Sequence, residues 1–149
     1  MEIKGGFLIS KIKYLNDRVF EKVLAEEGIE AFNGTQGRIL YILWDKNEVP
    51  IKTISKESGL AITSLTTILE NMEKDGLITR AKDETDKRQT MISLTKKARN
   101  LSKNFDNVSK KMNKIFYKYF DKEQIIMMEE GLQKICDSFE DANSKMLNS

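Results

Sequence analysis

Residues 77–95 have the sequence LITRAKDETDKRQTMISLT, in which two partly apolar stretches flank a wholly polar one. Residues 77–82 and 89–94 are rich in β-forming side chains and roughly alternate between apolar and polar types, which is the pattern of half-buried strands. The six residues between them, 83–88, are all polar or charged, as is typical of a turn. We therefore predict a β-hairpin with a charged tip.

Two short helices are predicted immediately before this hairpin. Apolar residues repeat with the spacing of one helix face at Leu65, Ile68, Leu69 and Met72. This helix is expected to run from about residue 61 or 62 to residue 75 and to stop at Gly76. A shorter helix should follow Pro50 and end at Gly59. Two helices joined by a glycine-containing turn form a helix-turn-helix, and a hairpin placed directly after one is called a wing.

Longer helical segments flank this centre. Residues 7–27 repeat apolar side chains at helical spacing, and Gly28 supplies a stop. A second helix is predicted to begin with Thr35 as its N-cap. The predicted fold class is mainly α with a small β-hairpin wing (α+β). Residues 35–94 would form the winged helix-turn-helix, and residues 1–34 and 95–149 would form a helical dimerisation platform.

The C-terminal third repeats apolar residues in steps of three and four. Thr95 is predicted to cap one long helix that carries this heptad-like pattern as far as Tyr119. After a break at Asp121, where Gln124 completes a capping box, a last helix continues the pattern. The first helix is the only other long one, so these apolar faces lack partners within the chain, which predicts a homodimer. The expected dimerisation residues are Leu8, Ile12, Leu15, Ile115, Tyr119, Ile125, Met128, Leu132, Ile135 and Phe139.

Composition excludes several kinds of chemistry. The 149 residues, about one domain's worth, include no histidine and one cysteine, which excludes a histidine catalyst, a Cys/His zinc site and a disulfide framework. We expect no cofactor, no metal and no enzyme activity, because no nucleophile–base pair stands out. We find no bilayer-spanning apolar run and no signal-peptide pattern at the N-terminus, so a soluble, cytoplasmic protein is expected.

Charge is unevenly distributed although the net charge is only +2. The segment 96–118 carries eight Lys or Arg residues and one Asp. A solvated helix exterior explains most such runs, but a basic middle also favours a nucleic-acid partner. Cys136 lies beside the apolar stripe of the last helix, where packing explains it better than redox sensing.

The order of these elements resembles the MarR (multiple antibiotic resistance regulator) family of winged helix-turn-helix transcription regulators. Residues 83–95 look like the wing signature of that family, with an acidic residue, then Asp86-Lys87-Arg88, then an alternating strand that ends in Leu94-Thr95. Residues 69–78 are similar to the end of the family's recognition helix, with Met72 where leucine is usual. The resemblance implies an obligate dimer that places two recognition helices in successive major grooves of a pseudo-palindromic DNA site.

The resemblance also implies which residues would contact double-stranded DNA. Arg88 would enter the minor groove, oriented by Asp86, and Lys82 and Lys87 would reach the backbone. Phosphate ligands near the start of the third helix would be Lys52, Thr53, Ser55 and Lys56. The recognition helix would contribute Thr63, Ser64, Thr66, Thr67 and Asn71, whose hydroxyl and amide groups can bond phosphates or base edges. The family often has a basic residue where Thr67 stands, so arginine readout of guanine is not expected there.

Two alternatives accompany this interpretation. The uncharged recognition face is compatible with a winged-helix module that binds protein without sequence-specific DNA binding. A small-molecule effector is a further expected partner, because aromatic residues could line a pocket between the platform and the DNA-binding domain. These aromatic residues are Phe7, Tyr14, Phe32, Tyr41 and Trp44, for most of which core packing is the preferred interpretation.

Overall fold

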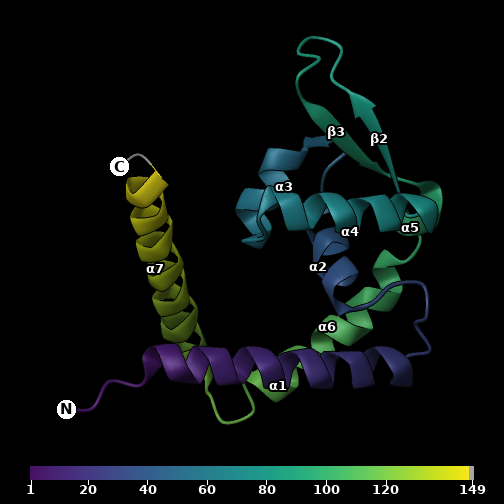
Figure 1. Ribbon diagram of the computed structural model, residues 1–149. Helices are drawn as coiled ribbons and strands as arrows, with labels where there is room; N and C mark the ends of the chain where they lie inside the picture. Colours follow the sequence, from purple (N-terminus) through teal and green to yellow (C-terminus); the bar gives the residue numbers. More distant parts are fainter. Residues whose placement is uncertain (148–149) are drawn as a thin grey trace. The chain divides into compact units, whose positions relative to one another are not determined.

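The computed structural model describes residues 1–147 and confirms the predicted fold class, mostly helical with a small antiparallel sheet (Figure 1). The chain divides into two compact units, the first ending at Met112 and the second beginning at Asn113. The elements are α1 (Gly5–Glu26), α2 (Gly34–Trp44), β1 (Val49–Pro50), α3 (Ile51–Ser58), α4 (Ile62–Lys74), β2 (Ile78–Lys82), β3 (Thr90–Leu94), α5 (Lys96–Arg99), α6 (Ser102–Phe116) and α7 (Lys122–Leu147).

The predicted hairpin is present, and it belongs to a three-stranded sheet. β2 and β3 pair antiparallel with Ile78 opposite Leu94 and Lys82 opposite Thr90. The unpredicted strand β1 pairs with the other side of β3, giving the order β1-β3-β2. β1 has only two residues, one of them Pro50, so it is too short to show an alternating pattern. Proline is tolerated there because β1 is an edge strand.

The helix-turn-helix is also present. α3 begins directly after Pro50 and ends at Gly59, whose φ of +77° is accessible mainly to glycine. α4 buries the predicted inner face, with Leu65, Leu69 and Met72 fully inaccessible to solvent. The backbone N–H of Leu77 donates to the carbonyl of Met72 over 2.9 Å, which closes the end of α4 and leads the chain into the wing.

The core of the first unit joins α1, the helix-turn-helix, the sheet and α6. It contains Val23 from α1, Leu40 from α2 and Val108 from α6. One shared core therefore contains residues from both the predicted platform and the predicted winged domain. Within it, the ring of Phe105 lies between about 4.9 and 6.1 Å from four other aromatic rings, those of Phe20, Phe32, Tyr41 and Trp44.

This cluster contains most of the aromatic residues that were considered for an effector pocket. Phe32, Tyr41 and Trp44 pack against Phe105, and the indole N–H of Trp44 donates to the carbonyl of Ala98 over 2.9 Å. Core packing is therefore the observed role of Phe32 and Trp44, whereas Tyr41 is 64% exposed and contacts the ring of Phe105 from the surface. Phe7 and Tyr14 lie on α1 with most of their side chains exposed, and they take no part in the cluster.

Two predicted helix boundaries are wrong. α2 is capped by Asn33 and not by Thr35, because Asn33 and Gln36 form a reciprocal capping box with 2.9 and 3.1 Å hydrogen bonds. The helix predicted to be continuous from Thr95 to Tyr119 is interrupted between α5 and α6 and ends at Phe116. Thr95 does cap α5, its hydroxyl accepting from the N–H of Ala98.

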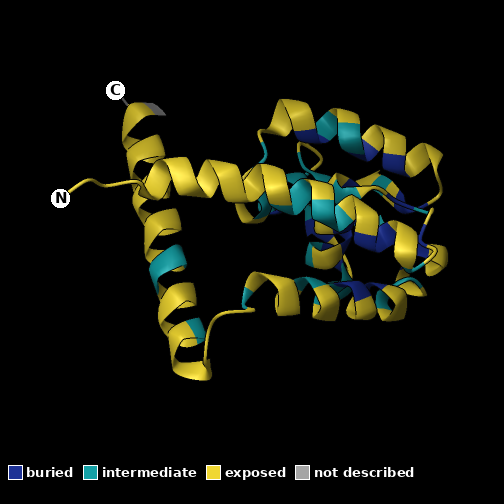
Figure 2. Ribbon diagram, turned by 90° about the horizontal axis from the view of Figure 1, so that it is seen from below, coloured by how far each residue is buried: buried dark blue, intermediate teal, exposed yellow. Residues whose placement is uncertain are grey.

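The second unit contains the end of α6 and all of α7. The predicted capping box is present, because Asp121 and Gln124 exchange two 2.9 Å hydrogen bonds just before α7. The Tyr117 hydroxyl donates to Glu129 over 3.1 Å, and partial burial raises the pKa of Tyr117. Figure 2 shows that α7 is almost entirely exposed. Among the described residues, no helix is both long and apolar enough to cross a membrane.

Candidate nucleic-acid interface

The outward face of α4 is polar and carries few charges. Opposite its buried residues, the structure exposes Thr63, Ser64, Thr67, Glu70 and Asn71. The only basic residue of α4 is Lys74, in its last turn. Hydroxyl and amide groups can donate to phosphates or bond base edges in a DNA groove, and threonine methyls can contact thymine methyls. Of the predicted α4 residues, Thr63, Ser64, Thr67 and Asn71 therefore share one accessible surface.

Two of the predicted DNA-binding hydroxyl groups already donate their proton within the protein. The Ser55 hydroxyl donates to the carbonyl of Leu60 over 2.6 Å, and this bond closes the turn after α3. The Thr66 hydroxyl donates to the carbonyl of Ile62 over 2.8 Å. A hydroxyl has one proton to donate and phosphate oxygens only accept, so both residues would have to exchange an internal bond to bind phosphate.

The start of α3 lies close enough to the wing for their charges to interact. Lys52 and Lys56 are exposed, and Thr53 is half-buried. The positive charge of Lys52 is among the causes that lower the pKa of Asp86. The structure thus places a cation of α3 within electrostatic reach of the hairpin tip, although 34 positions separate the two residues in the sequence.

The tip of the hairpin presents Arg88, whose side chain is 92% exposed. Its Nε and Nη2 donate to the two carboxylate oxygens of Asp86 at 3.1 and 3.4 Å, and its backbone N–H also donates to Asp86. These hydrogen bonds hold the pKa of Asp86 below its ordinary value, and those from the Arg88 side chain have the largest effect. The predicted contact between Asp86 and Arg88 is present, and Lys82 and Lys87 are exposed on the same hairpin.

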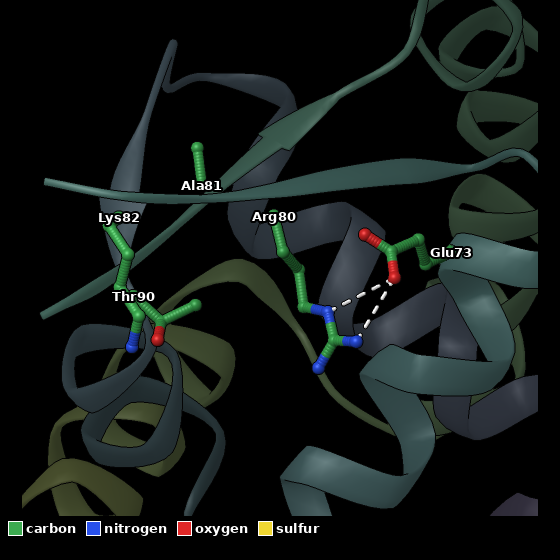
Figure 3. A pocket seen from close by; sticks show the side chains of 5 residues that line it. All are labelled: Glu73, Arg80, Ala81, Lys82 and Thr90. Atoms are coloured by element: carbon green, nitrogen blue, oxygen red, sulfur yellow. Dashed lines mark hydrogen bonds and ion pairs between the residues drawn. The ribbon is translucent and has the colours of Figure 1, made fainter.

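A pair of residues at the base of the hairpin was not predicted from the sequence. Arg80 of β2 donates from Nε and Nη2 to Oε1 of Glu73 on α4, at 3.3 and 3.0 Å. Both side chains line a cavity of about 320 Å³ together with Ala81, Lys82 and Thr90 (Figure 3). The alternation of Ile78, Arg80 and Lys82 could have indicated that Arg80 shares a face with Lys82. The pairing of Arg80 with Glu73 depends on how α4 packs against β2, and the sequence does not show this packing.

The predicted dimerisation residues lie on exposed or half-buried helix faces. On α1, Leu8, Ile12 and Leu15 are exposed. In the remainder of the set, Ile115, Tyr119, Met128, Ile135 and Phe139 are exposed, while Ile125 and Leu132 are half-buried. Tyr119 falls in the turn after α6 and not on a helix. No group of three His, Cys, Asp or Glu side chains placed to hold a metal ion occurs in the described part of the chain.

The helix-turn-helix, the hairpin with its arginine tip and the exposed polar face of α4 together define a winged helix-turn-helix, a class of DNA-binding domain. Residues 32–90 match the model of the MarR family. The chain is also 27% identical to the HTH-type transcriptional regulator MgrA of Staphylococcus aureus over 135 residues, which are 89% of this chain and 84% of MgrA.

Solved structures show the same fold. The S. aureus MepR–DNA complex superposes with a TM-score of 0.78 at 22% identity, covering 92% of this chain and 99% of that one. CouR from Rhodococcus jostii, solved bound to p-coumaroyl-CoA, gives a TM-score of 0.74 at 18% identity, with 88% and 90% covered. The chain thus resembles the MarR family in residues 32–90 and shares the fold of these solved structures.

Proposed function

We propose that this protein is a cytoplasmic repressor that binds a pseudo-palindromic duplex site as a homodimer and is released from it by a small-molecule effector. The observation that carries the proposal is the pairing of an accessible polar face on α4 with an exposed, carboxylate-held arginine at the tip of the adjoining hairpin. The polar face of α4 suits the major groove, and the arginine at the hairpin tip suits the neighbouring minor groove.

In this proposal each element contacts a different part of the duplex. The major groove receives Thr63, Ser64, Thr67 and Asn71, with Thr66 contributing through its oxygen or its methyl group. Arg88 enters the minor groove, where a weakly hydrated guanidinium meets concentrated negative potential. Backbone contacts come from Lys52, Thr53, Lys56, Lys82 and Lys87, while Ser55 stabilises the turn after α3.

The proposed dimer assigns a role to each part of the chain. Residues 1–34 and 95–149 would form the platform, and two copies of residues 35–94 would read half-sites about one helical turn apart. Support comes from the apolar side chains that α1 and α7 each expose. Isolated exposed apolar residues are ordinary, but a repeated stripe along a whole helix marks an interaction surface.

The proposed effector would shift the dimer between two spacings of its recognition helices. It could change DNA affinity only as far as it binds one spacing more tightly than the other. CouR was solved with an aromatic acyl-CoA, which makes a panel of phenolic acids and their CoA thioesters the first to test. Titrating this panel into the protein–duplex complex should identify a compound that releases DNA, and no response to any member would count against effector control.

The experiment that tests DNA binding is selection of duplexes from a random pool, followed by fluorescence anisotropy on the enriched sequence. Binding through several phosphates should weaken steeply as salt rises, with a slope of log K against log salt near −0.9 for each neutralised phosphate. Failure to enrich any sequence, with duplex binding that salt does not affect, would favour a winged-helix module that binds protein.

A further inference from the structure

The cavity beside the hairpin is lined mainly by groups that can donate hydrogen bonds. In β2 the side chains of Arg80 and Lys82 point to the same side of the strand, and Ala81 points to the other (Figure 3). Thr90 lies opposite Lys82 in the strand register. This face continues from the buried residues Ile78 and Ile92, so it is the side of the hairpin that faces the helices.

Arg80 uses only some of its guanidinium nitrogens to bind Glu73. Its Nε and Nη2 both donate to one oxygen of Glu73, and this pair does not use Nη1 (Figure 3). The Arg80 side chain is 30% exposed and that of Glu73 is 39% exposed, so the pair is partly shielded from water. The cavity therefore combines a guanidinium nitrogen, an ammonium group and a hydroxyl, all of which can donate to an anion.

In the proposed function, one DNA strand would pass beside this cavity. The major and minor grooves of B-DNA are separated by one sugar–phosphate strand. An element in the major groove and a neighbour in the adjacent minor groove must therefore lie on opposite sides of that strand. α4 and the hairpin are these two elements in the proposed function, and the cavity lies where α4 and β2 meet.

We propose that Arg80, Lys82 and Thr90 form a binding site for one backbone phosphodiester of the duplex, and that Glu73 is a built-in counter-charge that limits its affinity. This inference rests on the proposed function. The phosphate accepts from Nη1 of Arg80, Nζ of Lys82 and Oγ1 of Thr90. Glu73 keeps the guanidinium in place and neutralises part of its charge, which restrains binding to DNA of any sequence.

The test measures whether Arg80 and a single phosphate of the duplex contribute to binding together. A duplex selected by the wild-type protein is prepared as a set, each member carrying one uncharged methylphosphonate in place of a phosphate. Arg80→Gln should weaken binding of the unmodified duplex about threefold to tenfold and reduce the magnitude of the salt slope by about 1. One methylphosphonate should weaken wild-type binding by a similar factor and leave binding by the Arg80→Gln variant unchanged.

The role of Glu73 is tested by a double-mutant cycle. Glu73→Gln should strengthen binding to random-sequence duplex about threefold, and most of this gain should vanish in the Arg80→Gln background. Glu26→Gln removes the same charge from an exposed pair with Lys111 and should leave DNA affinity unchanged. An equal gain from Glu73→Gln in both backgrounds would reflect bulk charge alone and would overturn the counter-charge role.

Two further measurements separate the possible sources of failure. The Nε–H resonance of Arg80 should shift on adding the selected duplex but not on adding millimolar inorganic phosphate at constant ionic strength. A shift with phosphate alone would show that the cavity binds a free anion and would overturn the proposal. Enrichment of a duplex without coupling of any phosphate to Arg80 would reject this site while leaving DNA binding intact, whereas no enrichment would reject both.

Discussion

Asp86 and Arg88 show how much chemistry two residues of a local motif can specify. They stand two positions apart in a tight turn, so the chain itself brings the carboxylate to the guanidinium. The charge of Arg88 is thereby presented at a defined place while its side chain remains exposed. Such a contact could be predicted from the sequence because it requires no other part of the fold.

For Ser55 and Thr66 the sequence does not reveal that their hydroxyl groups already donate within the protein. Both residue types can bind phosphate, but each hydroxyl proton is already used by a backbone carbonyl nearby. A sequence shows that a hydroxyl group is present, but it does not show whether its proton is already used in an internal hydrogen bond. The hydroxyl proton goes to whichever acceptor the local backbone geometry brings into range.

Replacing Arg88 and Lys52 in turn should separate the two kinds of DNA contact. Arg88→Ala should weaken binding by about tenfold or more, and most strongly at sites with A·T-rich flanks, because narrow minor grooves concentrate negative potential. Lys52→Ala should weaken all sequences similarly and reduce the magnitude of the salt slope by about 1. Fluorescence anisotropy on matched duplexes with A·T-rich or G·C-rich flanks measures both. Equal effects of the two changes across all flanks would remove the minor-groove assignment.

Helix ends illustrate what can be predicted at the scale of elements. The ends at Gly28, Gly59 and Gly76 were all anticipated, because a positive φ is easily adopted only by glycine. The start of α2 was misplaced although its capping box was present in the sequence, as Asn33 followed three positions later by Gln36. Both Asn33 and Thr35 are acceptable caps, and only the position of Gln36 distinguishes them.

The cap of α2 gives a direct prediction about stability. Asn33→Ala should lower the free energy of unfolding by about 1 kcal/mol, because it leaves N–H groups of the first turn without an acceptor. Thr35→Ala, at the exposed position first predicted to be the cap, should change it by less than about 0.5 kcal/mol. Urea denaturation followed by circular dichroism compares the two variants. A larger loss from Thr35→Ala would show that the cap has been misassigned.

The two ion pairs of Asp17, one within α1 and one with α2, should make stability depend on pH. Asp17 accepts from Lys13 and from Arg38 of α2, and the Lys13 hydrogen bond, followed by the charge of Arg38, lowers the pKa of Asp17. A lowered folded-state pKa stabilises the fold above the ordinary aspartate value of 3.8 and ceases to do so as pH falls through the lowered value.

Asp17→Asn should therefore destabilise the protein at pH 7 by no more than about 1 kcal/mol, since the carboxylate is 41% exposed and screened by solvent. The difference between wild type and variant should shrink as pH is lowered from 5 towards 2. Denaturation curves collected across this range would detect it, and a difference that grows on acidification would contradict the assignment.

At the scale of the whole molecule, the repeated apolar faces of α1 and α7 are the feature that a single chain leaves unexplained. Leu8, Ile12 and Leu15 on α1 and Ile135 and Phe139 on α7 are exposed in the described structure. Exposing such stripes to water is costly, so a second copy that covers them would contribute a large part of the stability of the assembly.

Sedimentation velocity should find dimers at micromolar concentration. Phe139→Asp should raise the dissociation constant by about tenfold or more, because it places a charge in an apolar contact surface. Ser144→Asp adds the same charge on the polar side of α7 and should leave the dimer intact. A wild-type protein that sediments as single chains at this concentration would refute the dimer and with it the proposed pairing of recognition helices.

The sequence by itself determined the kinds of elements and their order, because periodicity, glycine stops and local caps act over a few residues. It also determined the hairpin, its Asp86–Arg88 tip and the polar face of α4. The tertiary structure decided the β1–β3 pairing, the clustering of aromatic rings around Phe105 and the meeting of Glu73 with Arg80. Each of these joins different elements, and how the elements pack depends on the whole core at once and not on any local pattern.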